Sequence, residues 1–235
     1  MQPGEGEPLR PGDTEYLQLV GALLHLAVWT RPDISHAVGV LSRFMSAPTQ
    51  AHLGAAKHVL RYLRGTQGLG ITFGGCSHQG SGLQGFADSD WAGDQGTRRS
   101  TTGVLFTLYG GPVSWRSKLQ PTVALSSVEA EYMALSNAVS EGLWLRQLLA
   151  DLDVSVGSIS IKSDSQGALA MAEAVGVSSR AKHIAIRHHF VREHVRTGLV
   201  QLGYVSTGEQ PADFLTKGLS KVKFEKCIQR INMCT

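Results

Sequence analysis

The sequence has few of the features that mark secreted, zinc-binding or membrane proteins. Only three cysteines occur among 235 residues, at positions 76, 227 and 234. Their odd number and uneven spacing argue against a disulfide framework and against a zinc site. No run of about 18 apolar residues is present, so no membrane span is expected. The first 13 residues are polar and acidic, unlike a signal or transit peptide. These absences favour a reducing, intracellular compartment, without separating cytoplasm from nucleus.

Charge is also sparse. Charged residues make up 17% of the chain, hydrophobic residues 42%, and the formal net charge is +3. Such a composition is typical of a globular protein and unlike a disordered one. The mildly basic balance is compatible with a polyanionic partner but does not identify one. The length allows one large domain or two smaller ones.

The pattern along the chain changes near residue 76, where we place a domain boundary. Residues 1–13 are rich in Gly, Pro and Glu and predict a disordered lead. Residues 14–75 contain three stretches of helical apolar spacing and predict a small helical domain. Residues 76–220 begin in a glycine-rich segment and then alternate between strand and helix patterns. Residues 221–235 are left as a C-terminal tail.

The alternating part predicts an α/β fold. Strand patterns lie in residues 83–90, 102–111, 112–118, 158–164 and 199–206, and helix patterns in 126–152, 165–174, 180–198 and 209–220. The order is therefore β-β-β-α-β-α-α-β-α. A hairpin sheet extended through helical crossovers gives a mixed five-stranded sheet with helices packed on it.

Acidic residues fall where these elements end. Asp88 ends the first strand, Asp164 ends the fourth, and Asp213 follows the fifth. Each alone could be a turn residue, a helix cap or a first-turn acid. At one edge of a sheet, however, two carboxylates 4 Å apart repel by roughly 4 kcal/mol at an effective dielectric of 20. A cluster of this kind indicates a cation site, and oxygen ligands favour magnesium or manganese.

The long helix offers two further acids, Glu129 and Glu131, which point to nearly opposite faces. The residues three, four and seven positions after Glu131 are small and apolar. We therefore expect Glu131 to face the sheet and Glu129 to be a solvated helix acid.

Several segments together resemble a known family. "SDSQGAL" (163–169), "EAEYMAL" (129–135) and "GEQPADFL" (208–215) resemble the acid-bearing segments of ribonuclease H. "ADSDWAGDQGTRRSTTG" and "KHIAIRHHFVRE" are similar to the ribonuclease H domain of copia-type long-terminal-repeat retrotransposons. "YLQLVGALLHLAVWTRPDISHAV" and "AAKHVLRYLRGT" resemble the end of the preceding reverse transcriptase. The resemblance covers about residues 14–220.

The resemblance implies metal-dependent cleavage of the RNA strand of an RNA–DNA hybrid. Its catalytic and metal-binding acids map to Asp88, Glu131, Asp164 and Asp213, and the other aspartates of "FADSDWAGD" become loop or turn residues. The expected cofactor is two Mg²⁺ ions about 4 Å apart, bridged by Asp88, with Mn²⁺ as an alternative. Glu131 is also placed to meet a 2′-hydroxyl, the group that marks RNA. The expected partners are the hybrid and the polymerase part of a reverse transcriptase. Candidate phosphate-binding residues, for which a solvated face is the alternative, are Arg98, Arg99, Arg116, Lys118, Lys182 and Arg187.

The sequence departs from the family at two positions. Ala185 stands where members usually carry an acid, and the loop "STGEQ" lacks the histidine of many cellular relatives. The chain also contains no Asp-Asp dipeptide, so it is not expected to polymerise DNA. Two rival readings stay open: a catalytically weak or dead domain that only binds nucleic acid, and a nuclease of integrase or resolvase type on the same fold.

Overall fold

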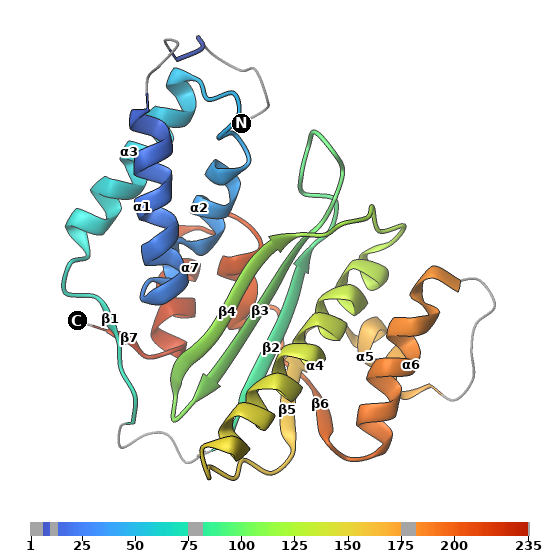
Figure 1. The fold of residues 1–235 in the computed structure, drawn as a ribbon. Helices are drawn as coiled ribbons and strands as arrows, with labels where there is room; N and C mark the ends of the chain where they lie inside the picture. Colours follow the sequence, from blue (N-terminus) through green and yellow to red (C-terminus); the bar gives the residue numbers. More distant parts are fainter. Residues whose placement is uncertain (1–6, 10–13, 75–81, 175–181, 235) are drawn as a thin grey trace.

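The computed structural model describes residues 7–9, 14–74, 82–174 and 182–234, and a five-stranded mixed sheet lies at its centre (Figure 1). The strands lie in the order β4-β3-β2-β5-β6, with the bounds β2 Gln84–Asp90, β3 Thr101–Leu108, β4 Gly111–Leu119, β5 Ile159–Ser163 and β6 Val200–Tyr204. Strands β2, β3 and β4 pair antiparallel, and β5 and β6 join in parallel. The expected mixed sheet is therefore confirmed. Because β2 and β5 are parallel, their carboxyl ends lie at the same edge.

One face of the sheet is covered by three helices, α4 Ser127–Asp151, α5 Gln166–Glu173 and α6 Lys182–Arg196 (Figure 1). The core on this face joins Ala87 and Phe106 of the sheet to Tyr132 and Leu135 of α4. Helix α4 also carries small buried residues on this face, Ala134, Ala138 and Gly142, which let it pack close to the strands. This close packing is what brings acids of α4 within reach of the sheet.

The opposite face is covered by a short 3₁₀ helix, η2 Pro211–Leu215, and by α7 Lys221–Arg230. Here Phe86 and Leu105 of the sheet pack against Phe214 and Ile228. The residues that follow Phe86 and Leu105 in sequence belong to the other core. The alternation of side chains along β2 and β3 therefore fills both cores, as a two-residue strand period requires.

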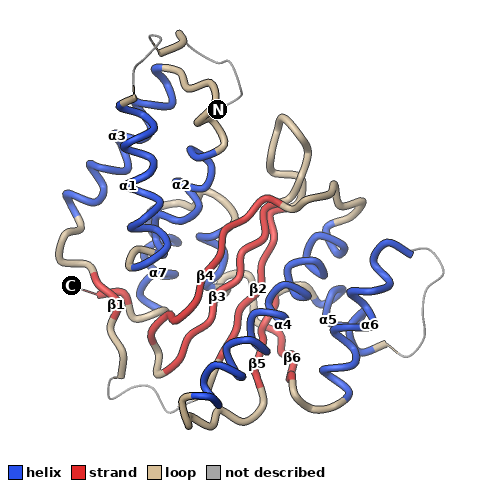
Figure 2. Tube along the Cα trace, in the orientation of Figure 1, coloured by secondary structure: helices blue, strands red, loops and turns tan. Residues whose placement is uncertain are grey.

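Helices of the N-terminal part form a third cluster, composed of α1 Glu15–Trp29, η1 Pro32–Ile34, α2 Ser35–Ser42 and α3 Gln50–Gly65. The Trp115 indole nitrogen of β4 donates a hydrogen bond to the Ala27 carbonyl at 2.6 Å. Arg43 pairs at 2.8 Å with Asp94, which lies in the loop that extends beyond β2 and β3 (Figure 2). The cluster is thus tied to the sheet at two separate points. Within the described ranges, no helix has the length and apolarity needed to cross a membrane.

The C-terminal part differs from the expected pattern. The helix expected over residues 209–220 is only the five-residue η2. Residues 221–235, expected as a tail, contain α7 and a short strand, β7 Met233–Cys234, which pairs antiparallel with β1 Gly70–Ile71. The first of these helices, η2, begins at a proline and ends before the glycine at position 218. The second forms because Cys227 and Ile228 find an apolar partner surface.

Most of the expected disordered lead, and the boundary placed near residue 76, lie outside the described residues. Residues 7–9 are described: the Leu9 amide donates to the Pro48 carbonyl at 3.2 Å, and Pro8 forms a β-bridge with Thr49. The division into domains made from the sequence stays a prediction.

Candidate functional site

Three acids from three elements meet at the edge where β2 and β5 end. Asp88 lies on β2, Asp164 directly follows β5, and Glu131 projects from α4. One carboxylate oxygen from each lies within 4.8 Å of the other two. Asp164 does not cap α5, because the Ser165 hydroxyl accepts the hydrogen bond from the Ala168 amide at 3.2 Å. We call Asp88, Glu131 and Asp164 the acid trio.

The trio is largely removed from water. Asp88 is 1% exposed, and Glu131 is partly buried. The Oε1 atom of Glu131 accepts a hydrogen bond from the Ser89 amide at 3.2 Å. Its Oε2 atom is buried and has no hydrogen-bond partner in the described part of the chain. Burial without a hydrogen-bond partner from the protein disfavours the charged form of this carboxylate.

The pKa values of the trio reflect this environment. Burial raises the pKa of Glu131 from 4.5 to about 8, and repulsion from Asp88 and Asp164 adds to the effect. Burial also raises the pKa of Asp88 to about 6, against the opposing attraction of Lys217 and the Thr216 hydroxyl. Near neutral pH and without a cation, Glu131 therefore favours its protonated form. A divalent cation would relieve the same repulsion, and three hard oxygen ligands fit magnesium or manganese.

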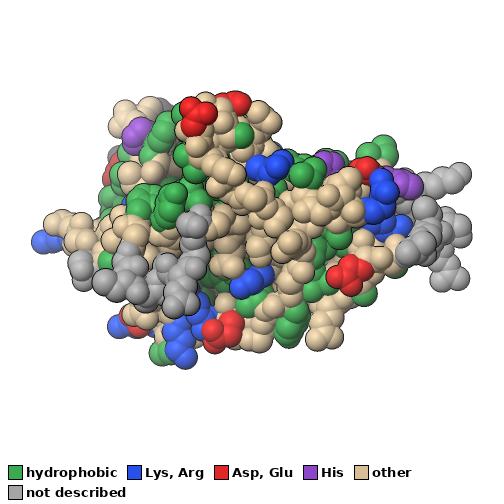
Figure 3. Space-filling view, turned by 90° about the horizontal axis from the view of Figure 1, so that it is seen from below, with side chains coloured by type: hydrophobic (Ala, Val, Ile, Leu, Met, Phe, Trp, Pro, Cys, Tyr) green, Lys and Arg blue, Asp and Glu red, His purple; other side chains and the backbone are tan. Residues whose placement is uncertain are grey.

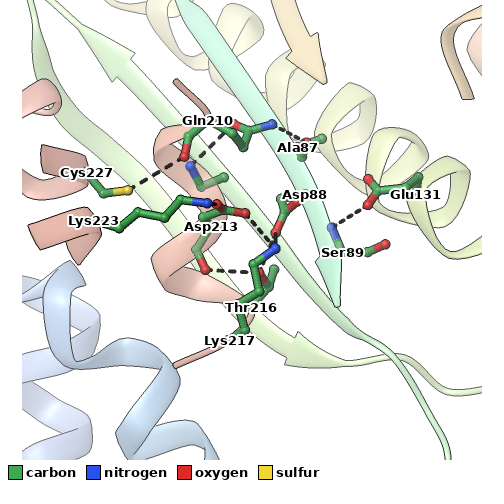
Figure 4. Close-up of polar contacts among 11 residues, drawn as sticks. Ala87, Asp88, Ser89, Glu131, Gln210, Asp213, Thr216, Lys217, Lys223 and Cys227 are labelled. Carbon is green, nitrogen blue, oxygen red and sulfur yellow. Dashed lines mark hydrogen bonds and ion pairs between the residues drawn. The ribbon is translucent and has the colours of Figure 1, made fainter. Parts of the chain in front are cut away.

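Asp213, the fourth expected acid, lies on η2 with no exposed surface. It is not part of the acid trio; its carboxylate lies between two ammonium groups (Figure 4). Lys217 Nζ is 2.7 Å from one oxygen, and Lys223 pairs with the other. Lys217 also lies 3.7 Å from Asp88 Oδ2. Burial lowers the pKa of Lys217, but attraction to Asp88 and Asp213 outweighs this and raises it, so the amine stays charged.

Hydrogen bonds at both ends fix the segment that carries Asp213 against strand β2. The Gln210 side-chain amide donates to the Ala87 carbonyl at 2.9 Å, and the Thr216 hydroxyl donates to the Asp88 carboxylate (Figure 4). Gly103, which pairs opposite Asp88, leaves room for this approach. A Cβ atom there would lie 2.7 Å from Thr216 Cγ2 and 3.1 Å from the Ala212 carbonyl oxygen.

Sequence reasoning did not single out Lys217, Lys223 or Thr216. The four-residue spacing between Asp213 and Lys217 was an available signal, because residues so spaced lie on one face of a helical turn. Lys223 comes from the next helix, and no local spacing relates it to Asp213.

Glu131 faces the sheet, as its helix position predicted. The expectation that Glu129 is solvated is wrong: Glu129 is 7% exposed. Its Oε2 atom accepts a hydrogen bond from the Leu125 amide at 2.8 Å, and its own amide donates to the Ser126 hydroxyl at 3.1 Å. Glu129 thus belongs to the N-terminal cap of α4, a role that a Ser followed three residues later by Glu often takes.

Asp94 has the loop role expected for it. Its Oδ1 atom accepts hydrogen bonds from the amide and the hydroxyl of Thr97, both at 2.7 Å. Its other oxygen pairs with Arg43. Asp90, at the end of β2, has a raised pKa because it is partly buried.

The expected phosphate-binding residues do not form a single group. Arg116 pairs with Glu141 of α4 at 2.8 Å, which neutralises it. Lys118 and Arg98 are exposed, and Arg99 is partly buried beside Thr97. Arg187 is partly buried on α6, whereas the side chain of Lys182, like that of Ala185, lies outside the described part. On the face shown in Figure 3, positive side chains are scattered among neutral and acidic ones.

Two adjacent histidines on α6, His188 and His189, differ in their surroundings. His188 is buried and stacks on Tyr132 with ring centroids 4.2 Å apart, whereas His189 is exposed. Burial lowers the pKa of His188, so it packs as a neutral ring.

Comparison with known proteins gives the following relatives. The chain is 44% identical over 218 residues to "Retrovirus-related Pol polyprotein from transposon TNT 1-94" of Nicotiana tabacum. It is 43% identical over 223 residues to the polyprotein from transposon RE1 of Arabidopsis thaliana. These alignments cover 93% and 94% of this chain but only 16% and 15% of the relatives. A third relative, "Secreted RxLR effector protein 161" of Plasmopara viticola, is 57% identical over 131 residues, which are 55% of this chain and 90% of that protein. No protein-family model matches the chain.

Among solved structures, the foamy viral protease–reverse transcriptase in complex with double-stranded DNA is similar in fold. It matches with a TM-score of 0.54 and 12% identity over 86% of this chain and 39% of that one. The sheet order and the helices flanking it are those of the ribonuclease H-like fold.

Proposed function

The chain belongs to the retrovirus-related Pol polyproteins of copia-type transposons, and we propose that its sheet part is a ribonuclease H-type endonuclease that cleaves the RNA strand of RNA–DNA hybrids. The observation that carries this proposal is the acid trio at the carboxyl ends of β2 and β5. Ligand sites in open α/β sheets form at such strand ends. The chain spans only about a sixth of its polyprotein relatives, so this proposal concerns this segment alone.

The residues of the trio fit a divalent cation, which we propose to be Mg²⁺ with Mn²⁺ as an alternative. When bound, such a cation supplies an activated water and stabilises charge on a phosphodiester. Asp88 and Glu131 are held for this role before any ligand arrives, Asp88 by the Thr216 hydroxyl and Glu131 by the Ser89 amide. Asp164 is only partly buried and follows the carboxyl end of β5, the edge at which ligands of open α/β sheets bind.

The remaining polar groups have supporting roles in this proposal. Glu131 is proposed to meet the 2′-hydroxyl of the RNA strand, the group by which proteins distinguish RNA from DNA. Arg98, Lys118 and Arg187 are proposed to contact phosphates. The helices of residues 14–74 are proposed to be the end of the reverse transcriptase part, and the polymerase part of that enzyme is the proposed partner.

A direct test uses the 235-residue chain with a hybrid labelled on its RNA strand. We expect cleavage in Mg²⁺, none in EDTA, and none of single-stranded RNA or duplex DNA. Glu131→Gln should lower the single-turnover rate by about two orders of magnitude or more, because a group that stabilises the transition state is lost. Glu129→Gln is the matched control: it makes the same change two residues away and keeps an oxygen for the Leu125 amide. A comparable loss in both variants would place the active acid elsewhere.

One observation favours a second candidate, a domain that binds hybrid without cleaving it. Two lysines neutralise Asp213, the acid expected to complete the site. Hybrid binding in Mg²⁺ without any product would support this candidate. Cleavage of duplex DNA in the same assay would instead favour a nuclease of integrase or resolvase type.

A further inference from the structure

The second feature of the site is a charge-balanced group beside the trio. Asp88 and Asp213 are both buried, with side chains 2% and 0% exposed, and they approach Lys217 from two elements. Lys217 Nζ lies 2.7 Å from Asp213 Oδ1 and 3.7 Å from Asp88 Oδ2. The Lys217 ammonium therefore lies between the carboxylate of Asp88 on β2 and the carboxylate of Asp213 on η2. A buried carboxylate pair is otherwise found with a bound cation or a shared proton.

We propose that Lys217 fills the second cation position of this site, so that the domain holds a single divalent cation, at the acid trio. This inference rests on the proposed function, because it takes the trio as the site of a divalent cation. It replaces the two-ion arrangement expected from the resemblance. Asp213 then acts through the lysine: it fixes the ammonium beside Asp88 instead of binding metal itself.

The backbone of η2 supports this placement. The Thr216 and Lys217 amides both donate to the Asp213 carbonyl, at 3.2 and 3.3 Å. This turn brings the Lys217 side chain back over the Asp213 carboxylate. The adjacent Thr216 hydroxyl donates to the same Asp88 oxygen that faces Lys217. One tight turn thus delivers a donor and a positive charge to Asp88.

The charges around Asp213 exclude a further divalent cation. Lys217 and Lys223 each pair with one oxygen of Asp213, so a metal ion binding there would have to share or displace an ammonium partner. A doubly charged ion beside the Lys217 ammonium would also meet like-charge repulsion in a site with little water to screen it. Lys223 differs from Lys217 in one respect that the experiment uses: its only ion pair among the described residues is with Asp213.

The test is a titration of the metal-free 235-residue chain with Mn²⁺, in the absence of nucleic acid, with bound ion counted by electron paramagnetic resonance. We expect one Mn²⁺ per wild-type chain and two per Lys217→Met chain. Lys223→Met is the matched control and should still bind one, because Lys217 stays between Asp88 and Asp213. Lys217→Arg should also bind one, because it keeps the positive charge. Thermal melting of each variant shows that it is folded.

Each result decides the matter. Two ions on the wild-type chain would overturn the inference while leaving the proposed nuclease intact, and so would one ion on a folded Lys217→Met chain. Two ions on Lys223→Met would show that any lost charge opens the site, which contradicts a specific role of Lys217. No Mn²⁺ on the wild-type chain would instead overturn the proposed metal-dependent function.

Discussion

Removing the Glu131 charge should change how the stability of the metal-free protein depends on pH. Burial raises the pKa of Glu131 from 4.5 to about 8, so the folded protein holds a proton that the unfolded chain releases between these values. The proton stabilises the folded state fully below the unfolded pKa, and this stability is lost as the pH rises through the folded pKa. The free energy of unfolding should therefore fall across this window.

The size of the effect follows from the pKa difference. Each pH unit corresponds to about 1.4 kcal/mol, so the full shift corresponds to roughly 5 kcal/mol. Because Glu131 is not fully buried, we expect about 2 to 5 kcal/mol. Glutamine resembles the protonated acid in shape and charge. Glu131→Gln should match the wild type below about pH 4 and exceed it in stability by this amount near about pH 8.5.

The assay is urea unfolding in EDTA at a series of pH values, with the free energy of unfolding extrapolated to water. Glu129→Gln is the control, because it alters a buried glutamate of the same helix outside the trio; its difference from the wild type should not depend on pH. Mg²⁺ should reduce the advantage of Glu131→Gln at high pH, since the cation stabilises the charged acid. If the difference between Glu131→Gln and wild type stays constant with pH, Glu131 is not a buried acid of raised pKa and the reasoning fails.

Three further outcomes are expected. Asp88→Asn should retain a cooperative melting transition and abolish hybrid cleavage; retained cleavage would remove Asp88 from the site. Millimolar Mg²⁺ should raise the melting temperature of the wild type. Asp164→Asn should melt higher than the wild type without metal and gain less from metal, and equal responses would show that the acids do not interact. Gly103→Ala should lower the free energy of unfolding by about 1 to 3 kcal/mol, because its Cβ meets Thr216 and the Ala212 carbonyl. Gly203→Ala, whose Cβ would lie 3.7 Å from Lys162, is its control and should cost less.

The sheet could be predicted because each strand and each crossover helix has a pattern within its own short stretch of sequence. Strands β2 and β3 alternate between two cores, and the crossovers through α4 and α5 fix which strands lie in parallel. Helix α7 could not be predicted in the same way. Half of its ten residues are charged, and it folds because Cys227 and Ile228 meet an apolar surface that includes Phe214. A periodicity shows which face is apolar, but not whether another element covers it.

The site residues likewise fall into those that local spacing predicts and those that it does not. The choice between Glu131 and Glu129 follows from helical phase, and the structure agrees with it. The cap formed by Glu129 depends on the turn before α4, and the solvated role assigned to it was wrong. The pairing of Asp213 with Lys223 joins η2 to α7, and the approach of Lys217 to Asp88 joins η2 to β2. These contacts depend on how separate elements pack, which residue spacing alone does not encode.

The pairing of β1 with β7 has a consequence for the order in which parts of the protein fold during synthesis. Ile71 pairs with Met233, and Met233 packs in the same core as Phe214 and Leu215, next to Asp213. During synthesis, the strands that carry Asp88 and Asp164 emerge from the ribosome well before this core can close. The nascent chain therefore holds Asp88 without its Lys217 neighbour until residue 217 has been added. Lys217 and Lys223, which balance Asp213, follow every strand of the five-stranded sheet in the sequence, so charge balance at the site is completed only after all five strands have been synthesised.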